Sequence, residues 1–163
     1  PDTRNGPLVS AAHKDKVTSY IDIGTAEATL AFGSVPDPFT DLDGYYVQPT
    51  IFTDVTNDMR IAREEIFGPV LSVLSFESDK ELVEKANDTI YGLAAGLWTR
   101  DISRAHRIAR AIDAGIIWIN CYDAYDVCSP FGGFKISGIG NELGRHTLDL
   151  YTQTKSVWVR LGR

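Results

Sequence analysis

The feature that most constrains the fold is an alternation of strand and helix signals between residues 70 and 119. Three short apolar runs are typical of buried strands: 70–76, 93–98 and 116–119. Two helical segments separate them. A capping box opens the first at Ser78, and Asp101 caps the second, which is predicted to run from Ile102 to Ala114. Strands and helices at this spacing form βαβ units, so the sequence predicts an α/β fold with a parallel sheet.

An earlier helix is predicted to begin after Ser10, a good N-cap, and to end near Asp22 because Gly24 follows. His13 and Lys16 stand one turn apart on its polar side. Residues of this kind usually form a solvated helix face. The pattern alone therefore assigns them no role.

The region between this helix and residue 61 is rich in turn formers. A strand is predicted at Thr29–Phe32. Tyr45–Phe52 is also rich in β-forming residues, but Pro49 cannot donate to a ladder, which predicts an edge strand or an irregular extended segment. Asn57 or Asp58 is predicted to cap a short helix after it.

The stretch Ile61–Leu74 joins a polar helical piece to an apolar strand. It carries adjacent carboxylates, Glu64 and Glu65, followed by Phe67 and a Gly68-Pro69 breaker. The breaker forces a turn, which places a carboxylate and a ring at the mouth of a strand, where α/β sheets bind ligands. By spacing alone, two adjacent glutamates are better explained as a solvated helix end.

The segment that follows residue 120 differs from the rest of the chain. Residues 121–140 combine aromatics with glycines and a proline, which predicts a long functional loop. The glycines do not form the G-x-G-x-x-G fingerprint of dinucleotide sites, so we interpret them as bending positions. Residues 151–161 alternate like a strand, and a strand without a hairpin neighbour needs an acceptor sheet.

Composition excludes several classes of protein. The 163 residues are 44% hydrophobic and 23% charged, which is typical of a globular domain. A net charge of −6 argues against nucleic acid as a partner, and no apolar run reaches the roughly 20 residues of a membrane helix. Two cysteines make no disulfide framework, which suits the cytoplasm. Because the one methionine is Met59, we expect the chain to be a C-terminal piece of a longer protein.

Four blocks, in this order, resemble segments of the NAD(P)-dependent aldehyde dehydrogenases. They are G-P-L-V at 6–9, G-Y-Y-V-Q-P-T-I-F at 44–52, R-E-E-I-F-G-P-V at 63–70, and S-P-F-G-G-F-K-I-S-G-I-G-N-E-L-G at 129–144. The resemblance covers essentially the whole chain. It implies an incomplete catalytic domain at residues 1–140 and a short helix with an oligomerisation strand at residues 141–163.

The resemblance also implies roles for individual residues. Glu65 would accept hydrogen bonds from the nicotinamide-side ribose, and Phe67 would pack beside the nicotinamide of NAD or NADP. Tyr125 and Phe131 would line the aldehyde tunnel, although ordinary core packing is the alternative for both. In relatives, the position of His13 is a glutamine near the adenosine ribose, and for His13 the ribose and a solvated helix face both stay open.

The resemblance implies that the parent enzyme oxidises an aldehyde to a carboxylic acid through a cysteine thiohemiacetal. The nucleophilic cysteine, the glutamate base and the oxyanion asparagine are expected upstream of Pro1. Cys121 is predicted to be buried and Cys128 to be exposed, and neither matches the position of the family's catalytic cysteine. No metal site is expected. We therefore expect an inactive chain that assembles with the missing part of its protein into a homodimer or homotetramer. A non-catalytic, self-associating module is the alternative.

Overall fold

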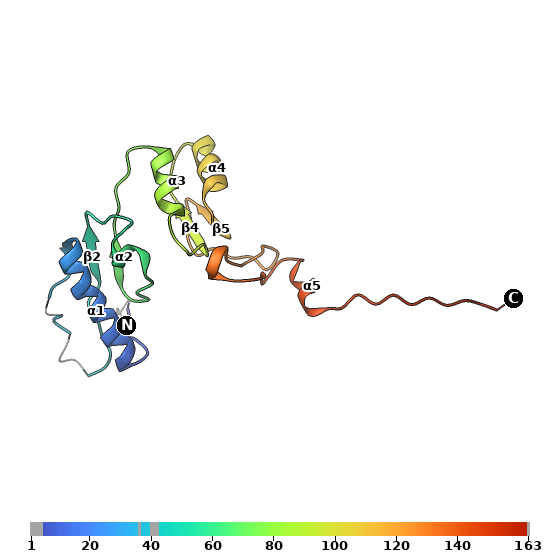
Figure 1. Ribbon diagram of the computed structural model, residues 1–163, viewed down its shortest axis with the longest axis horizontal. Coiled ribbons are helices and arrows are strands. Elements are labelled where there is room, and N and C mark those ends of the chain that lie inside the picture. The colour runs from blue at the N-terminus through green and yellow to red at the C-terminus, as the bar shows by residue number, and fades with distance from the viewer. Residues whose placement is uncertain (1–4, 36, 40–42, 163) are drawn as a thin grey trace. The chain divides into compact units, whose positions relative to one another are not determined.

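A computed structural model describes residues 5–35, 37–39 and 43–162 (Figure 1). The chain divides into two compact units, residues 1–85 and 86–163, and each is described here by itself. The elements in chain order are α1 (Ala11–Glu27), β1 (Thr29–Phe32), β2 (Thr50–Thr53), α2 (Arg60–Arg63), β3 (Val70–Ser72), α3 (Asp79–Asn87), β4 (Ala94–Leu97), α4 (Ile102–Ala111), β5 (Ile116–Ile119), the 3-10 turn η1 (Lys135–Ser137) and α5 (Thr147–Tyr151). Among the described residues, no helix is long and apolar enough to cross a membrane. The predicted α/β class, with parallel strand pairing, is confirmed.

The first unit is built on a three-stranded sheet in the order β1-β2-β3. β2 pairs antiparallel with β1 and parallel with β3, so it is the central strand. For Tyr45–Phe52, the edge-strand alternative was wrong, because β2 is central, whereas residues 45–49 lie in no helix or strand, in line with the irregular alternative. Pro49 immediately precedes β2. The first backbone donor of the ladder is therefore the Thr50 amide, which donates to the Pro69 carbonyl at 2.9 Å. A proline at that place removes no ladder bond.

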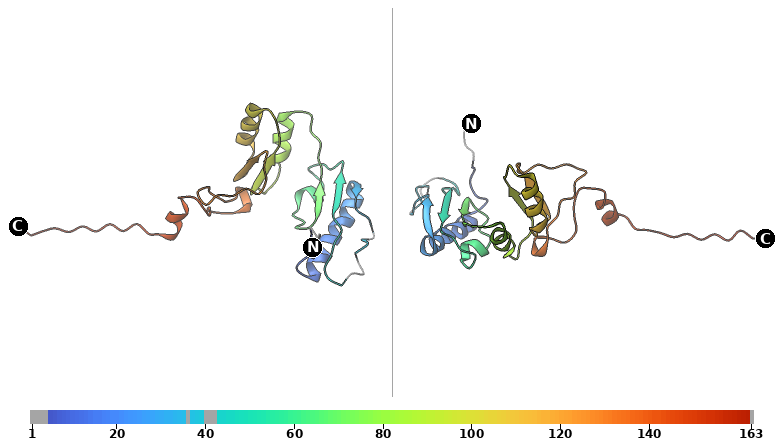
Figure 2. Two further views of the ribbon diagram at one scale, coloured as in Figure 1. Left: turned by 180° about the vertical axis from the view of Figure 1, so that it is seen from behind. Right: turned by 90° about the horizontal axis from the view of Figure 1, so that it is seen from above.

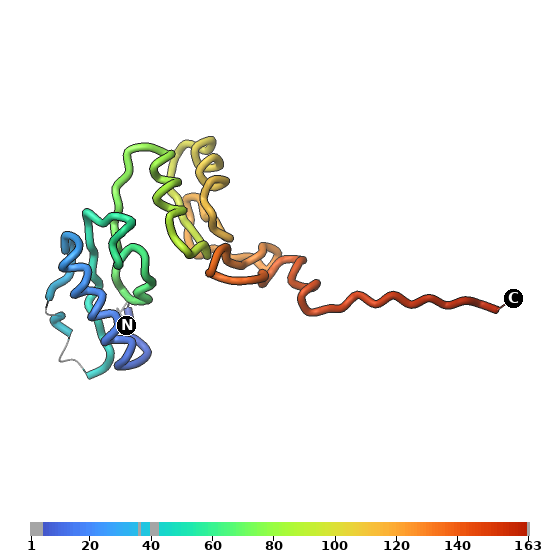
Figure 3. Tube along the Cα trace, in the orientation of Figure 1, coloured from blue at the N-terminus to red at the C-terminus, as the bar shows by residue number. Residues whose placement is uncertain are grey.

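Helix α1 runs alongside this sheet (Figure 3). Its start is as predicted, because the Ser10 hydroxyl accepts a hydrogen bond from the His13 amide at 3.2 Å. Its end is not, since the helix continues through Gly24 to Glu27. Gly24 is buried, and a Cβ atom there would lie 2.6 Å from the Phe52 ring. The glycine therefore serves close helix-to-sheet packing and does not terminate the helix.

Packing of α1 on the sheet generates the core of the first unit. The buried apolar residues that form one cluster are Val17, Ile21, Val47, Phe52, Val55, Ile61 and Ile66. Val17 and Ile21 come from one stripe of α1, at the spacing expected for a helix that buries a single face. Phe52, on the central strand, is fully buried under that stripe.

A polar contact joins α1 to the end of α2. The Tyr20 hydroxyl donates to the Glu64 carboxylate, which also forms an ion pair with Arg60 at 2.9 Å. The Arg60 hydrogen bond, followed by the Tyr20 bond, lowers the pKa of Glu64 from 4.5 to about 2. The predicted cap of this short helix was wrong, because its N-cap is Met59 and the Asp58 carboxylate bonds instead to the Thr56 hydroxyl at 2.5 Å.

The second unit contains the parallel pair β4-β5, with α4 as the crossover beside it (Figure 2). Asp101 caps α4 as predicted, its carboxylate accepting from the Arg104 amide at 2.9 Å. The predicted run of parallel strands is interrupted, however. β3 lies in a different sheet from β4, because it pairs with β2. The residues of β2 belong to the segment for which the sequence predicted an edge strand or an irregular structure.

The end of the chain forms no strand among the described residues. Helix α5 ends at Tyr151, and residues 152–162 lie in no helix or strand and are exposed throughout. The alternation of residue types predicted a strand here that needs an acceptor sheet. A strand requires a neighbouring backbone, and the described part of this chain provides none for it.

Replacing Gly24 with alanine tests the packing of α1 on the sheet. Helix propensity alone favours the substitution by about 1 kcal/mol. The new methyl group would clash with a ring that is fully buried, so we expect Gly24→Ala to lower the free energy of unfolding by about 1–3 kcal/mol. Chemical denaturation measures the difference, with exposed Asp22→Ala as the control on the same helix. Increased stability would contradict the packing.

The Glu64 ion pair predicts a pH dependence of stability. A carboxyl whose pKa falls on folding stabilises the protein above its unfolded pKa, and that stabilisation is lost as the pH drops. The loss should therefore fall between pH 4.5 and about 2. We expect the melting temperature of Glu64→Gln to lie below that of the wild type at neutral pH and to converge with it near pH 2. Glu84→Gln, in an exposed pair with Lys80, is the control.

Candidate functional site

The turn between α2 and β3, residues 64–69, brings the predicted carboxylate and ring together. Ile66 is buried and anchors the turn, whereas Glu65 and Phe67 on either side of it are exposed. Phe67 has a φ of +58°, in the left-handed region that non-glycine residues rarely occupy. Such a conformation costs about 1–3 kcal/mol and persists only where the surroundings hold it.

A single stripe of α1 holds this turn. His13 Nε2 lies 2.6 Å from the Phe67 carbonyl oxygen, and Lys16 Nζ donates to the Glu65 carbonyl at 2.8 Å. Tyr20, one turn further along, donates to the Glu64 carboxylate. Positions separated by three and four residues share one helix face, so a single stripe of α1 reaches the turn at residues 67, 65 and 64.

The turn also packs directly on α1. A Cβ atom on Gly68 would lie 2.6 Å from a methyl group of Val17, which is fully buried. Only a residue without a side chain allows the backbone to approach the helix this closely. The position of Phe67 therefore depends on the helix both through hydrogen bonds and through van der Waals contact.

The two adjacent glutamates have different surroundings. Glu64 is engaged by Arg60 and Tyr20. The Glu65 carboxylate is exposed, and within the described residues its side chain has no hydrogen-bond or ion-pair partner. Of the two carboxylates, the fold thus leaves the one at position 65 available to a ligand.

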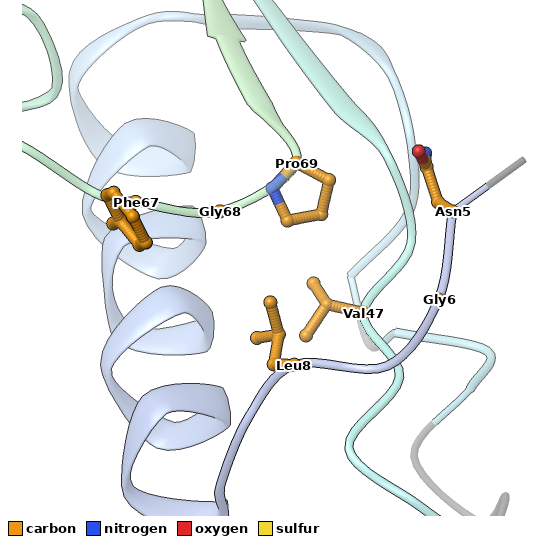
Figure 4. A pocket seen from close by; sticks show the side chains of 7 residues that line it. All are labelled: Asn5, Gly6, Leu8, Val47, Phe67, Gly68 and Pro69. Atoms are coloured by element: carbon orange, nitrogen blue, oxygen red, sulfur yellow. The ribbon is translucent and has the colours of Figure 1, made fainter.

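Phe67 lines a pocket of about 500 Å³ (Figure 4). The residues around it are Asn5, Gly6, Leu8, Val47, Phe67, Gly68 and Pro69. The Leu8 and Val47 side chains lie next to each other and point toward Pro69. Glu65 does not line this pocket, although its neighbour in the turn does. Leu8 and Val47 were given no role by the sequence, and their place in the first two resembling blocks was the available signal.

The contacts of His13 and Lys16 correct the expectation for the polar side of α1. Neither residue is part of a merely solvated face, because both reach backbone carbonyls of the 64–69 turn. The His13 ring also approaches the Phe67 ring, with centroids 5.9 Å apart and planes tilted by 36°. The His13 Nδ1 atom is buried and has no hydrogen-bond partner among the described residues.

In the second unit, Tyr125 and Phe131 belong to an aromatic cluster. Their ring centroids are 5.4 Å apart, and Tyr125 also meets Trp118 edge-on at 5.6 Å. Trp118 lies on β5, is buried, and donates from Nε1 to the Ala124 carbonyl at 2.9 Å. Tyr122 completes the cluster at 5.0 Å from Trp118. Neither Trp118 nor Tyr122 was singled out from the sequence.

The cluster is partly polar and partly open to solvent. Tyr125 and Tyr122 are exposed, whereas Phe131 is half-buried. A hydrogen bond with Asp123 raises the pKa of the Tyr125 hydroxyl, so this phenol stays neutral near pH 7. Rings with this exposure can pack in a core or line a channel, and both interpretations from the sequence remain compatible with their positions.

Close backbone crossings hold the loop that carries these rings. A Cβ atom on Gly115 would lie 1.7 Å from the Gly132 carbonyl oxygen, so the loop passes directly over the start of β5. Phe131 forms a two-bond antiparallel bridge with Glu142, each bond being 2.7 Å long. Gly115 and Gly132 therefore allow close approach of two backbone segments, which was not predicted, whereas the positive φ values of Gly140 and Gly144 agree with the predicted bending positions.

The two cysteines are free thiols and belong to no metal-binding cluster in the described part of the chain. Cys128 is exposed as predicted, but Cys121 is exposed too, and the prediction that it is buried was wrong. It follows the last residues of β5, where the chain leaves the sheet for the loop. Within the described residues there is no group of three or more His, Cys, Asp or Glu that could hold a metal ion.

Comparison with known proteins extends these observations. The chain is 50% identical over 160 residues to the putative aldehyde dehydrogenase DhaS of Bacillus subtilis, covering 98% of this chain and 32% of the relative. It is 55% identical over 163 residues to a betaine aldehyde dehydrogenase of Brucella anthropi, covering 99% and 34%. This chain thus spans about a third of the length of these relatives.

Solved structures agree. Indole-3-acetaldehyde dehydrogenase AldA of P. syringae, in complex with NAD+ and IAA, matches with a TM-score of 0.90 and 49% identity over 98% of this chain and 32% of that chain. The NAD+ complex of an aldehyde dehydrogenase from Bacillus cereus matches with a TM-score of 0.88 and 48% identity over 99% and 32%. The aldehyde dehydrogenase family profile matches residues 1–157. This chain therefore belongs to the aldehyde dehydrogenase family.

Proposed function

We propose that this chain is the nicotinamide-side part of an enzyme that oxidises an aldehyde to a carboxylic acid with NAD+. The observation that carries the proposal is the 64–69 turn. It presents a carboxylate without a side-chain partner among the described residues and, two residues on, a ring that is 72% exposed beside a pocket. An exposed acceptor next to an exposed apolar ring suits a ligand that is polar at one end and flat at the other.

The residues present fit the nicotinamide half of such a cofactor. A carboxylate offers two oxygens to the two hydroxyls of a ribose, and charge-assisted hydrogen bonds of this kind are the stronger ones. The Phe67 ring offers a flat apolar wall to the base. When bound, the cofactor would supply the hydride acceptor. NAD rather than NADP is supported by the relatives from P. syringae and Bacillus cereus, which were solved with NAD+.

Tyr125 and Phe131 are proposed to line the path of the aldehyde. Aromatic side chains with a few polar groups are the usual lining of small-molecule sites. The packing of Tyr125 on buried Trp118, and of Phe131 on Tyr125, supports this role, since it links both rings to β5 while leaving part of their surface open. The nucleophilic cysteine, the glutamate base and the oxyanion amide are proposed to come from a part of the protein outside these 163 residues.

We also propose that residues 141–163 act in assembly, separately from the catalytic portion at residues 1–140. Val157, Val159 and Leu161 recur at every second position, as on one face of a strand, and Trp158 between them is 93% exposed. Pairing with the sheet of another subunit in a homodimer or homotetramer would satisfy this backbone and cover these side chains. A cytoplasmic location, with no nucleic acid or membrane as partner, is part of the same proposal.

Substitution of Glu65 in the full-length enzyme tests the cofactor role. Glu65→Gln keeps one acceptor but loses the charge, so we expect kcat/KM for NAD+ to fall about tenfold. Steady-state kinetics with varied NAD+ and saturating aldehyde provide the measurement. Glu84→Gln, exposed on α3, is the control for the loss of one carboxylate and should leave kcat/KM unchanged. An unaltered Glu65→Gln enzyme would refute the role.

The 163-residue chain alone provides a second test. We expect no increase in NADH absorbance when it is mixed with NAD+ and an aldehyde, because the proposed nucleophile is not part of it. The full-length enzyme, assayed in parallel, should produce NADH. Turnover by the isolated chain would disprove this division of labour. A full-length protein that lacks turnover would favour the alternative of a non-catalytic, self-associating module.

A further inference from the structure

The left-handed backbone at Phe67 must be held in place by contacts within the protein, because binding a cofactor with its ring does not restrain its backbone. Its carbonyl oxygen is 2.6 Å from His13 Nε2, the shorter of the two contacts from α1 to carbonyls of the turn. The same imidazole lies 5.9 Å from the Phe67 ring. One side chain therefore contacts both the backbone and the ring of the residue that forms the proposed nicotinamide wall.

We propose that His13 is a positioning residue, which fixes the orientation of Phe67 and thereby the nicotinamide half of the cofactor. It acts through Phe67 and touches no reacting atom. This inference rests on the proposed function and deepens it. It differs from the role implied by the resemblance, in which this helix position serves the adenosine ribose.

The placement of protons supports this assignment. A carbonyl oxygen can only accept, so Nε2 must carry the hydrogen that joins His13 to Phe67. In the neutral ring, Nδ1 is then an acceptor, and it is buried without a partner among the described residues. With Nε2 engaged by the Phe67 carbonyl and Nδ1 buried, neither nitrogen is available to a ribose hydroxyl.

Packing restricts the movement of the imidazole. Ser10 caps α1 at the His13 amide, and Val17, one turn on, is fully buried against the 64–69 turn. The histidine backbone is thus fixed on both sides. An aliphatic residue of similar volume at this position would keep the packing but leave the Phe67 carbonyl without its donor.

The test compares variants of the full-length enzyme. His13→Leu removes the donor at similar volume, His13→Gln retains an N–H group of comparable reach, and exposed Asp15→Asn on the same helix is the control. Calorimetry measures the dissociation constants of NAD+ and of AMP, which lacks the nicotinamide half. Hydrogen exchange of the peptide that spans residues 64–70, without cofactor, reports on the turn itself.

We expect His13→Leu to raise the dissociation constant of NAD+ about tenfold, because a carbonyl loses its donor and the turn loosens. The dissociation constant of AMP should stay unchanged, and exchange in the 64–70 peptide should accelerate. His13→Gln should restore both properties to near wild-type values, which a loss of general stability would not explain. Asp15→Asn should behave as the wild type.

Two outcomes would overturn the proposal. If AMP binding weakens together with NAD+ binding, His13 serves the adenosine side. If NAD+ binding and exchange are both unchanged in His13→Leu, the contact positions nothing. A wild-type enzyme that binds no NAD+ would refute the proposed function instead, and the exchange measurement would still decide whether His13 holds the turn. Should His13→Leu not fold, His13→Asn, whose amide is too short to reach the carbonyl, takes its place.

Discussion

The contact between α1 and the 64–69 turn is the constraint on which the first unit depends. A bare Gly68 rests on buried Val17, and three polar side chains from the same helix stripe reach successive groups of the turn. Hydrophobic packing sets the distance, and the hydrogen bonds set the register. The left-handed backbone conformation of Phe67 persists because contacts with α1 and with the rest of the turn restrain it. The candidate site is therefore a property of the packed unit and not of a flexible loop.

The same arrangement separates two carboxylates that the sequence presents as equivalent. The Glu64 carboxylate is bound within the protein itself, where hydrogen bonds from Arg60 and Tyr20 lower its pKa and keep it charged. Glu65 contributes only its carbonyl to the scaffold, through Lys16, and its carboxylate stays exposed. Because Glu64 fixes the turn, the Glu65 carboxylate is left for a ligand while the Glu65 backbone stays in place. One of these adjacent glutamates stabilises the fold and the other faces solvent. Spacing alone therefore could not decide between a solvated helix end and a ligand-binding site.

Most local signals were read correctly from the sequence, the cap of α2 being an exception, and long-range ones were not. The caps at Ser10 and Asp101 and the strands at 29–32 and 116–119 depend on neighbours within a few residues. Gly24 was misread because its reason for being glycine is the Phe52 ring, 28 positions away in the sequence. The centre of the first sheet was missed for a similar reason, since both partners of β2 lie far along the chain. Glu65 and Phe67 were placed by resemblance, whereas the His13 contact required coordinates.

Residues 152–162 show the limit of a strand pattern that lacks a partner. Alternating apolar side chains predict a sheet, yet in the described part of the chain these residues pair with nothing and stay exposed. Burial of such side chains is worth about 25 cal/mol per Å² of apolar surface, and backbone pairing adds hydrogen bonds to it. Both gains become available together when another sheet edge is presented. The proposed assembly role would supply that edge from the sheet of another subunit.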